Sequence, residues 1–189
     1  MNIFVVNQDP VIAAQELCDK HVVKMILESA QMLSTAHRLL DGDMYIERND
    51  ADTRNVKRWR LHDSREGILY KVVHINHPCT VWTRECSANY MWHYRHFAAL
   101  CDEYTHRYSK VHSTDTLLRE ALSRLPNNIR MSDTTTAMPM AIFDECKTSS
   151  DPVECYRNYY QTKQQRFRMS WTKRHVPDWF RFQDEEYIL

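Results

Sequence analysis

The sequence predicts a mainly α-helical protein that folds as a single domain over residues 1–189. Two observations lead to this fold class: two long segments carry apolar residues at helical spacing, and turn or capping residues bound them. A third is the composition, because 43% hydrophobic and 26% charged residues are ordinary values for a globular chain with its own core. We therefore expect two long helices packed together, a C-terminal helix and a short N-terminal strand.

The first long helix is expected over residues 10–40. Asp9 can cap its N-terminus, and Pro10 suits the first helical position because an N–H has no helical partner there. Gly42 marks the end of the helix. Ahead of it, the short apolar run NIFVV, residues 2–6, suits a strand or an extended start.

A second long helix is expected over residues 80–108, and a third begins at Asp151. Asp151 caps this third helix, Pro152 takes its first position, and Glu154 can reach back to the cap. Between the long helices we expect a polar loop over 41–66 and a strand or helix end over 68–78. After the second long helix we expect a shorter helix from Ser113 or Thr114 to about Leu125 and a loop over 126–150. The chain is expected to end in an extended aromatic tail over 171–189.

Glycine and cysteine usage argues against several classes of protein. The chain has two glycines, Gly42 and Gly67, whereas phosphate-binding loops and dinucleotide-binding turns need glycine for close backbone approach. None of the six cysteines forms a C-x-x-C pair, which argues against a zinc ribbon. We expect no cofactor, and we expect the cysteines to be reduced and mostly to serve in packing.

The location of the protein is predicted from its start and its hydropathy. The start MNIFVVNQDP lacks the basic region of a secretion signal, and no run approaches the roughly 18 apolar residues of a membrane span. We therefore expect a cytoplasmic protein, in the host cytoplasm if a phage encodes it, with no membrane partner. The formal net charge is zero, so an electrostatic site must come from a local patch.

The first predicted helix gathers acid, base and imidazole on one side. His21, Lys24, Glu28 and Gln31 are spaced i, i+3, i+7 and i+10, which places them on one helical face. A lysine beside a glutamate on a partly buried face can serve acid–base or amine chemistry. The alternative is a solvated face with stabilising ion pairs. The apolar surroundings favour a functional role.

The second predicted helix repeats this pattern, with Glu85, Asn89, Trp92 and His96 on one face. If the two helices pack, Glu28 and Glu85 are expected to line one cleft, although satisfaction of polar groups in the core explains the pattern equally well. The chain has two H-x-x-H pairs, and the pair in this helix has the spacing of two metal ligands. No C-x-x-C or H-E-x-x-H motif accompanies them, so no metal site is predicted.

Phosphate contacts are expected at the start of the second helix and in the C-terminal third. The segment INHPCTVWTRE, residues 75–85, contains Arg84 and begins a helix whose free amides can bind an anion, although an ordinary N-cap explains it as well. From Arg157 to Arg181, seven basic residues alternate with aromatic ones, and Asp178 is the only acid. Basic side chains can bind phosphates while aromatic rings stack on bases, which favours nucleic acid over membrane as the partner. The alternative is a helix whose aromatic residues belong to the core and whose basic residues are solvated.

The first helix also resembles a known family. The sequence LCDKH, with Glu28 seven residues after the histidine, is similar to the phage pyrimidine-dimer DNA glycosylases of the endonuclease V type, in which an early D-x-H precedes the catalytic Glu at this spacing. YRNYYQTK, residues 156–163, resembles the family's aromatic-basic stretch that lies against DNA, and NHPCTVWTRE more loosely resembles the start of its second long helix. The chain is also similar to small tailed-phage proteins of unassigned function.

This resemblance implies an all-helical fold that flips a base out of DNA and cuts its glycosidic bond. In the family the α-amine of the first residue attacks the sugar carbon to form an imine, and the Glu stabilises charge and relays protons. Only Glu28 matches the family by position. Asn2 is large enough to block removal of the initiator methionine, so the amine would belong to Met1, and Leu27 and Ser29 stand where the family has basic residues.

The sequence therefore predicts a phage-type DNA-processing enzyme, specifically a DNA glycosylase acting on a damaged or modified base. Glu28 is the expected catalytic carboxylate, with Lys24 and His21 as its neighbours. The alternatives are a non-enzymatic phage protein that inhibits a host factor and an enzyme that modifies DNA bases or nucleotides. The residues expected to bind duplex DNA are Arg84, Lys163, Arg166, Trp171, Lys173 and Arg174.

Overall fold

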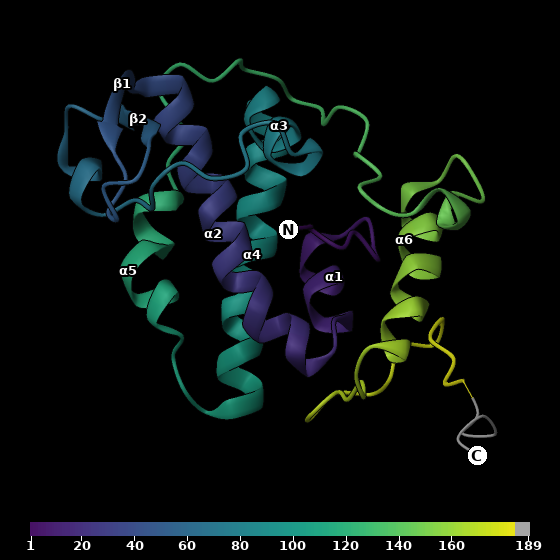
Figure 1. Ribbon diagram of the computed structural model, residues 1–189. Helices are drawn as coiled ribbons and strands as arrows, with labels where there is room; N and C mark the ends of the chain where they lie inside the picture. The colour runs from purple at the N-terminus through teal and green to yellow at the C-terminus, as the bar shows by residue number, and fades with distance from the viewer. Residues whose placement is uncertain (184–189) are drawn as a thin grey trace.

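Helices dominate the computed structural model, which describes residues 1–183, and they confirm the mainly α fold class (Figure 1). The last part of the predicted aromatic tail, residues 184–189, lies outside the described residues. The elements are α1 (Pro10–Glu16), α2 (Asp19–Asp41), β1 (Asp43–Arg48), β2 (Asn55–Arg60), η1 (Ser64–Gly67), α3 (Pro78–Glu85), α4 (Ser87–Tyr108), α5 (Ser113–Leu122), η2 (Asp144–Cys146), α6 (Pro152–Gln161) and η3 (Thr162–Gln165).

Each of the two predicted long helices is broken once near its start. Leu17 and Cys18 adopt extended backbone conformations between α1 and α2, and the Tyr160 hydroxyl accepts the Cys18 N–H at 2.9 Å. Cys86 is extended between α3 and α4. The side chain of Asn89 spans this second break and donates to the Trp82 carbonyl at 2.9 Å. Periodicity alone does not report such breaks, because the apolar pattern continues across them.

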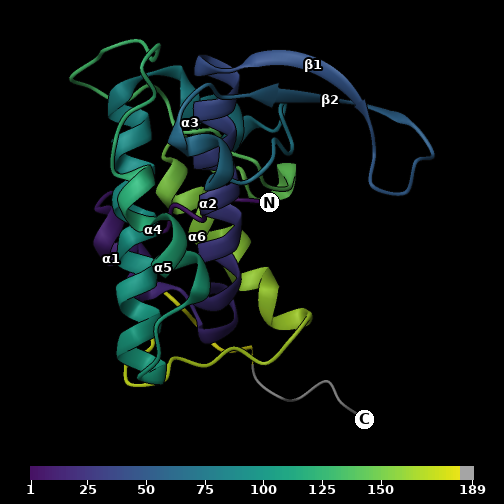
Figure 2. The same cartoon turned by 90° about the vertical axis from the view of Figure 1, so that its left-hand side faces the viewer.

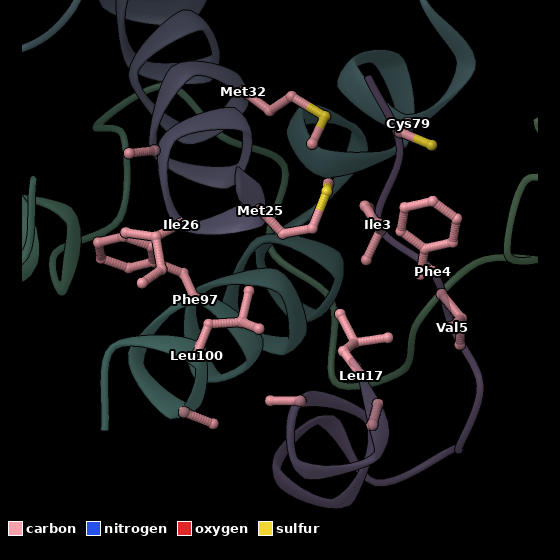
Figure 3. Packing of buried hydrophobic residues seen from close by; sticks show 14 of the residues in the cluster. Ile3, Phe4, Val5, Leu17, Met25, Ile26, Met32, Cys79, Phe97 and Leu100 are labelled. Carbon is pink, nitrogen blue, oxygen red and sulfur yellow. The ribbon is translucent and has the colours of Figure 1, made fainter. Parts of the chain in front are cut away.

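The core lies between α2 and α4, which pack against each other as predicted. Ile26 of α2 lies beside Phe97 of α4, whereas Met25 points towards Met32 and Ile3, and all of these side chains are fully buried or nearly so (Figure 3). Helices α5 and α6 lie on opposite sides of this pair (Figure 1). Full burial of each such side chain contributes about 1.5–3 kcal/mol, so this layer fixes the position of α2.

The N-terminal segment, residues 2–6, is extended and buried in this core, but it pairs with no strand in the described part of the chain. The predicted N-terminal strand is therefore an extended start, which the sequence also allowed. Phe4 has a φ of 56°, in the left-handed region that is costly for a bulky residue. Burial of its ring, which stacks on His21 at 4.6 Å, offsets that cost.

Residues 43–60 form a β-hairpin where the sequence was expected to form a loop. Strands β1 and β2 pair antiparallel, with Asp43 opposite Arg60 and Arg48 opposite Asn55. The side-chain oxygen of Asn49 accepts the N–H groups of Thr53 and Arg54 and closes the turn. Charged residues in both strands mask the alternation that identifies a half-buried strand.

The hairpin leaves the body through a closely packed base. Arg38, only 5% exposed, donates hydrogen bonds to the carbonyls of Trp59, Glu66, Leu69 and Tyr70, and to the carboxylate of Glu66. A Cβ on Gly42 would lie 2.7 Å from the Arg38 carbonyl oxygen and 3.0 Å from that of Arg60. Glycine is therefore required where α2 gives way to β1. No helix within residues 1–183 is long and apolar enough to cross a membrane.

Candidate active site

The first residues of the chain are fixed in place by Asn2, which is 5% exposed. Its side-chain amide donates to the Ala141 carbonyl at 2.8 Å. Its side-chain oxygen accepts the N–H groups of Ile3 and Phe4, at 2.7 and 3.2 Å. Because these contacts orient the backbone on both sides of Asn2, they also fix the direction in which Met1 points.

Glu28 lies beside this N-terminal segment, on α2. Its Oε2 accepts the Asn2 N–H at 3.2 Å and lies 3.6 Å from the Met1 nitrogen. Its Oε1 lies 3.3 Å from the Nζ of Lys24, one helical turn earlier. The Glu28 side chain is 15% exposed, whereas that of Lys24 is 65% exposed. A largely sheltered carboxylate thus stands between a backbone amine and a solvent-facing ammonium.

The exposed part of Met1 is its main chain. The side chain is 4% exposed, and the Thr80 hydroxyl lies 3.7 Å from its sulfur, while the residue as a whole is only half-buried. The packed side chain leaves the nitrogen at the surface, next to Glu28. An amine held in this way beside a carboxylate can act as a nucleophile, because the neighbouring group can take part in proton transfer.

His77 is a candidate that the sequence analysis did not single out for catalysis. It caps α3, and its Nδ1 accepts the Cys79 N–H at 3.2 Å, which leaves Nε2 for the proton of the neutral ring. Burial lowers the pKa of His77, the positive charges of the Met1 amine and His74 lower it further, and Glu28 opposes the shift. Because Nδ1 is engaged and Nε2 carries the proton, the neutral ring presents a hydrogen-bond donor at Nε2. Its only sequence signal is a histidine before the helix-starting proline.

A pocket of about 480 Å³ opens beside Glu28. Its volume is within the range of small-ligand sites. A larger cavity, about 570 Å³, lies near the other end of α2, but its Arg65 is already paired with Asp41 and Asp63. The pocket beside Glu28 is lined by Val23, Lys24, Leu27, Gln31, Tyr70, His112, Ser113 and Thr114 in addition to Glu28.

Cationic groups collect on this side of α2. Lys163 is 5% exposed, and its Nζ lies 3.5 Å from the ring centroid of Tyr159. Burial, together with smaller contributions from the charges of Arg166 and Lys24, lowers the pKa of Lys163 to about 8. Lys20 places its Nζ 4.7 Å from a neighbouring aromatic ring. Positive charge therefore extends from Lys24, beside Glu28, to the segment that follows α6.

His21 belongs to the core rather than to the surface beside Glu28. Its Nδ1 is 2.7 Å from the Tyr160 hydroxyl, and its ring packs on Phe4 and Phe167. Burial lowers the pKa of His21 to about 3, with smaller contributions from the charges of Lys163 and Lys24. His21 is consequently neutral near pH 7 and holds the aromatic layer beneath the N-terminal segment.

Four of the six residues expected to bind DNA make internal contacts. Arg84 donates to the Ile75 carbonyl, Trp171 donates its indole N–H to the Glu16 carbonyl at 2.8 Å, and the Lys173 ammonium donates to the His106 carbonyl. Arg174 forms an ion pair with Glu103, which is 2% exposed. Lys163 is buried as described above, so Arg166 is the one member of the predicted set that is exposed and whose side chain makes no hydrogen bond or ion pair within residues 1–183.

Glu85 does not share the pocket of Glu28. Its side chain is exposed and accepts a hydrogen bond from Thr136 at 2.7 Å, so the predicted common cleft is wrong. The polar face of α4 is buried instead, with His93 hydrogen-bonded to Thr83 at 2.7 Å and His96 at 0% exposure. Among residues 1–183, no three His, Cys, Asp or Glu side chains converge in a metal-binding arrangement.

A family model described as pyrimidine dimer DNA glycosylase matches residues 1–117, well over half of the chain. The chain belongs to this family. Neither a curated protein nor a solved structure matches it. The match confirms the family that the LCDKH motif and the spacing of Glu28 suggested.

The matched range of this pyrimidine dimer glycosylase family includes every group placed around the Met1 nitrogen. Met1, Asn2, Glu28 and His77 all lie within residues 1–117, whereas α6 and the C-terminal segment lie beyond it. The resemblance of residues 156–163 to the DNA-contacting stretch of the family therefore stays a prediction. DNA as the substrate class follows from the family itself.

Proposed function

We propose that the protein is a DNA glycosylase that cleaves a glycosidic bond at pyrimidine dimers, with the amine of Met1 as its nucleophile. One observation carries the proposal: the Met1 nitrogen lies 3.6 Å from Oε2 of Glu28, the residue to which the sequence resemblance gives the role of catalytic glutamate. The Asn2 contacts and the buried Met1 side chain support it, because they hold the nitrogen in this position at the surface.

In the proposed reaction the lone pair of the amine attacks C1′ of the damaged nucleotide. The N–C1′ bond forms as the C1′–N1 bond to the pyrimidine breaks, and the electrons of that bond stay on the pyrimidine, which takes up a proton and remains linked to its neighbour through the dimer. The new secondary ammonium loses a proton to the carboxylate of Glu28, whose Oε2 lies beside the amine. Opening of the C1′–O4′ bond then gives a protonated imine, and O4′ takes up a proton to become a hydroxyl.

Glu28 has two roles in this scheme. Its carboxylate stabilises positive charge that develops on the sugar as the glycosidic bond breaks, and it relays a proton during opening of the sugar ring. Lys24 holds one carboxylate oxygen at 3.3 Å, which leaves the other directed at the amine. Because the Lys24 side chain is 65% exposed, its ammonium also lies where a DNA phosphate would approach.

Borohydride trapping on a duplex with a single pyrimidine dimer tests the proposal. Borohydride reduces the imine to a stable amine, so we expect a covalent protein–DNA adduct, and peptide mapping should place it on residue 1. The undamaged duplex should give no adduct. The mass of the purified protein shows independently whether the Met1 nitrogen is a free amine.

Two variants serve as matched controls for the identity of the amine. Lys24→Arg removes the amino group beside Glu28 and Lys163→Arg removes that of the buried lysine near Lys24, while both keep the positive charge. Both variants should still give the adduct on residue 1. An adduct that disappears in either variant would assign the nucleophile to that lysine, and an absence of glycosidic-bond cleavage by the wild-type protein would disprove the glycosylase activity.

A further inference from the structure

The β-hairpin, strands β1 and β2 with their turn, extends past the helices on the side of the molecule where the N-terminus lies (Figure 2). No described element covers its outer part in either view (Figures 1 and 2). A two-stranded ribbon without a covering layer is marginally stable in water, so its packed base and its own side-chain contacts must hold it in place.

Every acid of the hairpin already has a cationic or imidazole partner. Asp43 pairs with His62 at 2.8 Å, and Glu47 pairs with Arg58 at the same distance. The two acids of the turn are likewise paired, Asp52 with Arg48 at 2.7 Å and Asp50 with Lys71 at 3.6 Å. Within residues 1–183, the side chains of Arg54 and Lys57 form no ion pair, so the hairpin presents uncompensated positive charge.

The two faces of the hairpin differ in chemistry. One face carries the paired acids Asp43 and Glu47. The other carries Met44 and Ile46, which are 51% and 61% exposed, with Lys57 directly opposite Ile46. Because side chains alternate between faces, no carboxylate of either strand lies on this second face. Exposed apolar groups beside an unpaired cation indicate a binding surface.

The base of the hairpin is rigid enough to position such a surface. Arg38 holds the carbonyl of Trp59 on β2 and three carbonyls of the following segment. Gly42 allows the last turn of α2 and the carbonyl of Arg60 to approach each other closely. The outer strands therefore have a fixed direction relative to α2, which also carries Glu28.

We propose that the hairpin is an arm that binds the DNA duplex on one flank of the lesion, an inference that rests on the proposed glycosylase function. Arg54 and Lys57 contact phosphates, while Met44 and Ile46 lie against sugars and base edges, as apolar side chains do in DNA grooves. A six-residue strand is about 20 Å long, which corresponds to roughly six base pairs.

The charge of the second face favours DNA over a protein partner. A second copy of the chain docked on this face would bring the unpaired cation of Lys57 towards its counterpart, which costs free energy through repulsion. The phosphate backbone neutralises them instead. The position of the hairpin on the same side as the N-terminus places it next to DNA whose damaged nucleotide is at Met1 (Figure 2).

Duplex length provides the test. The variant Arg54→Gln/Lys57→Gln is compared with wild type on a duplex with roughly 15 base pairs on each side of the dimer and on one with about four, which is shorter than the reach of the hairpin. For the long duplex we expect an affinity loss of about tenfold or more and a salt slope lower by about two. Affinity for the short duplex and the melting temperature should not change.

Two further variants separate charge from packing. Lys110→Gln removes an exposed cation at the α4–α5 connection and should leave both affinities unchanged. Ile46→Ser should weaken binding to the long duplex without altering the salt slope, because it removes no charge. Unchanged affinity and salt slope in Arg54→Gln/Lys57→Gln would overturn the proposal, as would a dimer that Ile46→Ser dissociates while DNA binding stays the same.

Failure of the hairpin proposal is distinguishable from failure of the glycosylase proposal. Excision of dimers from the short duplex by the wild-type protein reports on Met1 and Glu28 alone. Binding to a long undamaged duplex reports on the hairpin without the reaction. If the wild-type protein and Arg54→Gln/Lys57→Gln cleave dimers equally well on every duplex, the glycosylase proposal stands and the hairpin proposal is wrong.

Discussion

Asp19 and Glu28 lie on the same helix, and each contacts an ammonium or guanidinium group, yet their surroundings differ. Asp19 accepts hydrogen bonds from Arg107 at 2.9 Å, from the Ser170 hydroxyl at 2.9 Å and from the N–H and hydroxyl of Thr172. Burial alone would raise the pKa of Asp19, but these donors outweigh it and lower the pKa. Its hydrogen-bonding capacity is used entirely within the protein.

Glu28 has fewer partners, and they are of another kind. Two of them, the Met1 and Asn2 nitrogens, belong to the backbone at the start of the chain, and the third is the largely exposed ammonium of Lys24. A pocket opens beside it, whereas Asp19 lies against the C-terminal segment. The comparison shows that a cluster of charges on a helix becomes a candidate site only where its partners remain accessible to a ligand.

Replacement of Glu28 by glutamine is expected to have the largest effect on activity. The amide keeps the shape but cannot stabilise cationic charge or relay a proton, so we expect glycosidic-bond cleavage to fall by about 10²–10⁴-fold. Stability should change by only about 1 kcal/mol, because the lost ion pairs are with the exposed Lys24 ammonium and the Met1 amine, at 3.3 and 3.6 Å. Single-turnover cleavage of the glycosidic bond and thermal melting of the same sample measure both. A large loss of stability with retained turnover would make Glu28 structural.

Replacement of Glu103 by glutamine should show the opposite pattern. Glu103 pairs with the guanidinium groups of Arg107 and Arg174 at 2.7 and 2.8 Å, and Arg107 is fully buried. Removal of this charge leaves a buried guanidinium partly unpaired, which typically costs about 3–5 kcal/mol of the free energy of unfolding. Urea denaturation measures that loss, and glycosidic-bond cleavage per folded molecule at low temperature should be unchanged. Loss of activity in the folded variant would contradict the structural role.

The sequence predicts the helices, their packing and Glu28 because these depend on local spacing. It does not show which carboxylates of α2 are used up in internal contacts, since the donors to Asp19 come from Arg107, Ser170 and Thr172, far away in the sequence. The Met1 nitrogen reaches Glu28 through buried contacts of Asn2 with Ala141, a residue far away in the sequence. The sequence-based prediction of DNA binding included Arg174. Its ion pair with Glu103 forms only in the folded chain, so the sequence alone does not show that this charge is already neutralised.

Acidification should lower the stability of the protein through its buried histidines. Burial lowers the pKa of His21 and His96 to about 3 and that of His37 to about 4, from an ordinary value of 6.5. Between pH 6.5 and about 4 the unfolded chain binds protons that the native protein excludes, so stability falls as pH falls. Each histidine contributes a slope of about 1.4 kcal/mol per pH unit.

Urea denaturation of His21→Gln and of His175→Gln over this pH range provides the measurement. His175 is exposed, so its replacement should leave the slope unchanged, whereas His21→Gln should reduce it by about one proton. Equal slopes for all three proteins would show that His21 titrates in the native state near its ordinary pKa.

The smallest expected effect separates two arginines of the C-terminal segment. Arg166 is exposed, and Arg166→Gln should lower the slope of log affinity against log salt by about one on duplex DNA, with little change in melting temperature. Arg174→Gln should lower the melting temperature and leave the salt slope unchanged, because its guanidinium already pairs with Glu103. If the salt slope falls for Arg174→Gln and not for Arg166→Gln, the phosphate contact belongs to Arg174 and this prediction is wrong.

The bonds of Arg38 at the base of the hairpin have a consequence for divergence within the family. Asp43 and Arg60 face each other across the two strands, so chain can be inserted or deleted between them without moving either end. The contacts of Arg38 with the segment after β2 and the close approach at Gly42 remain intact in such a change. Arm length can therefore vary between relatives without disturbing the catalytic body, which makes this hairpin a position where new binding properties can arise at low cost to the fold.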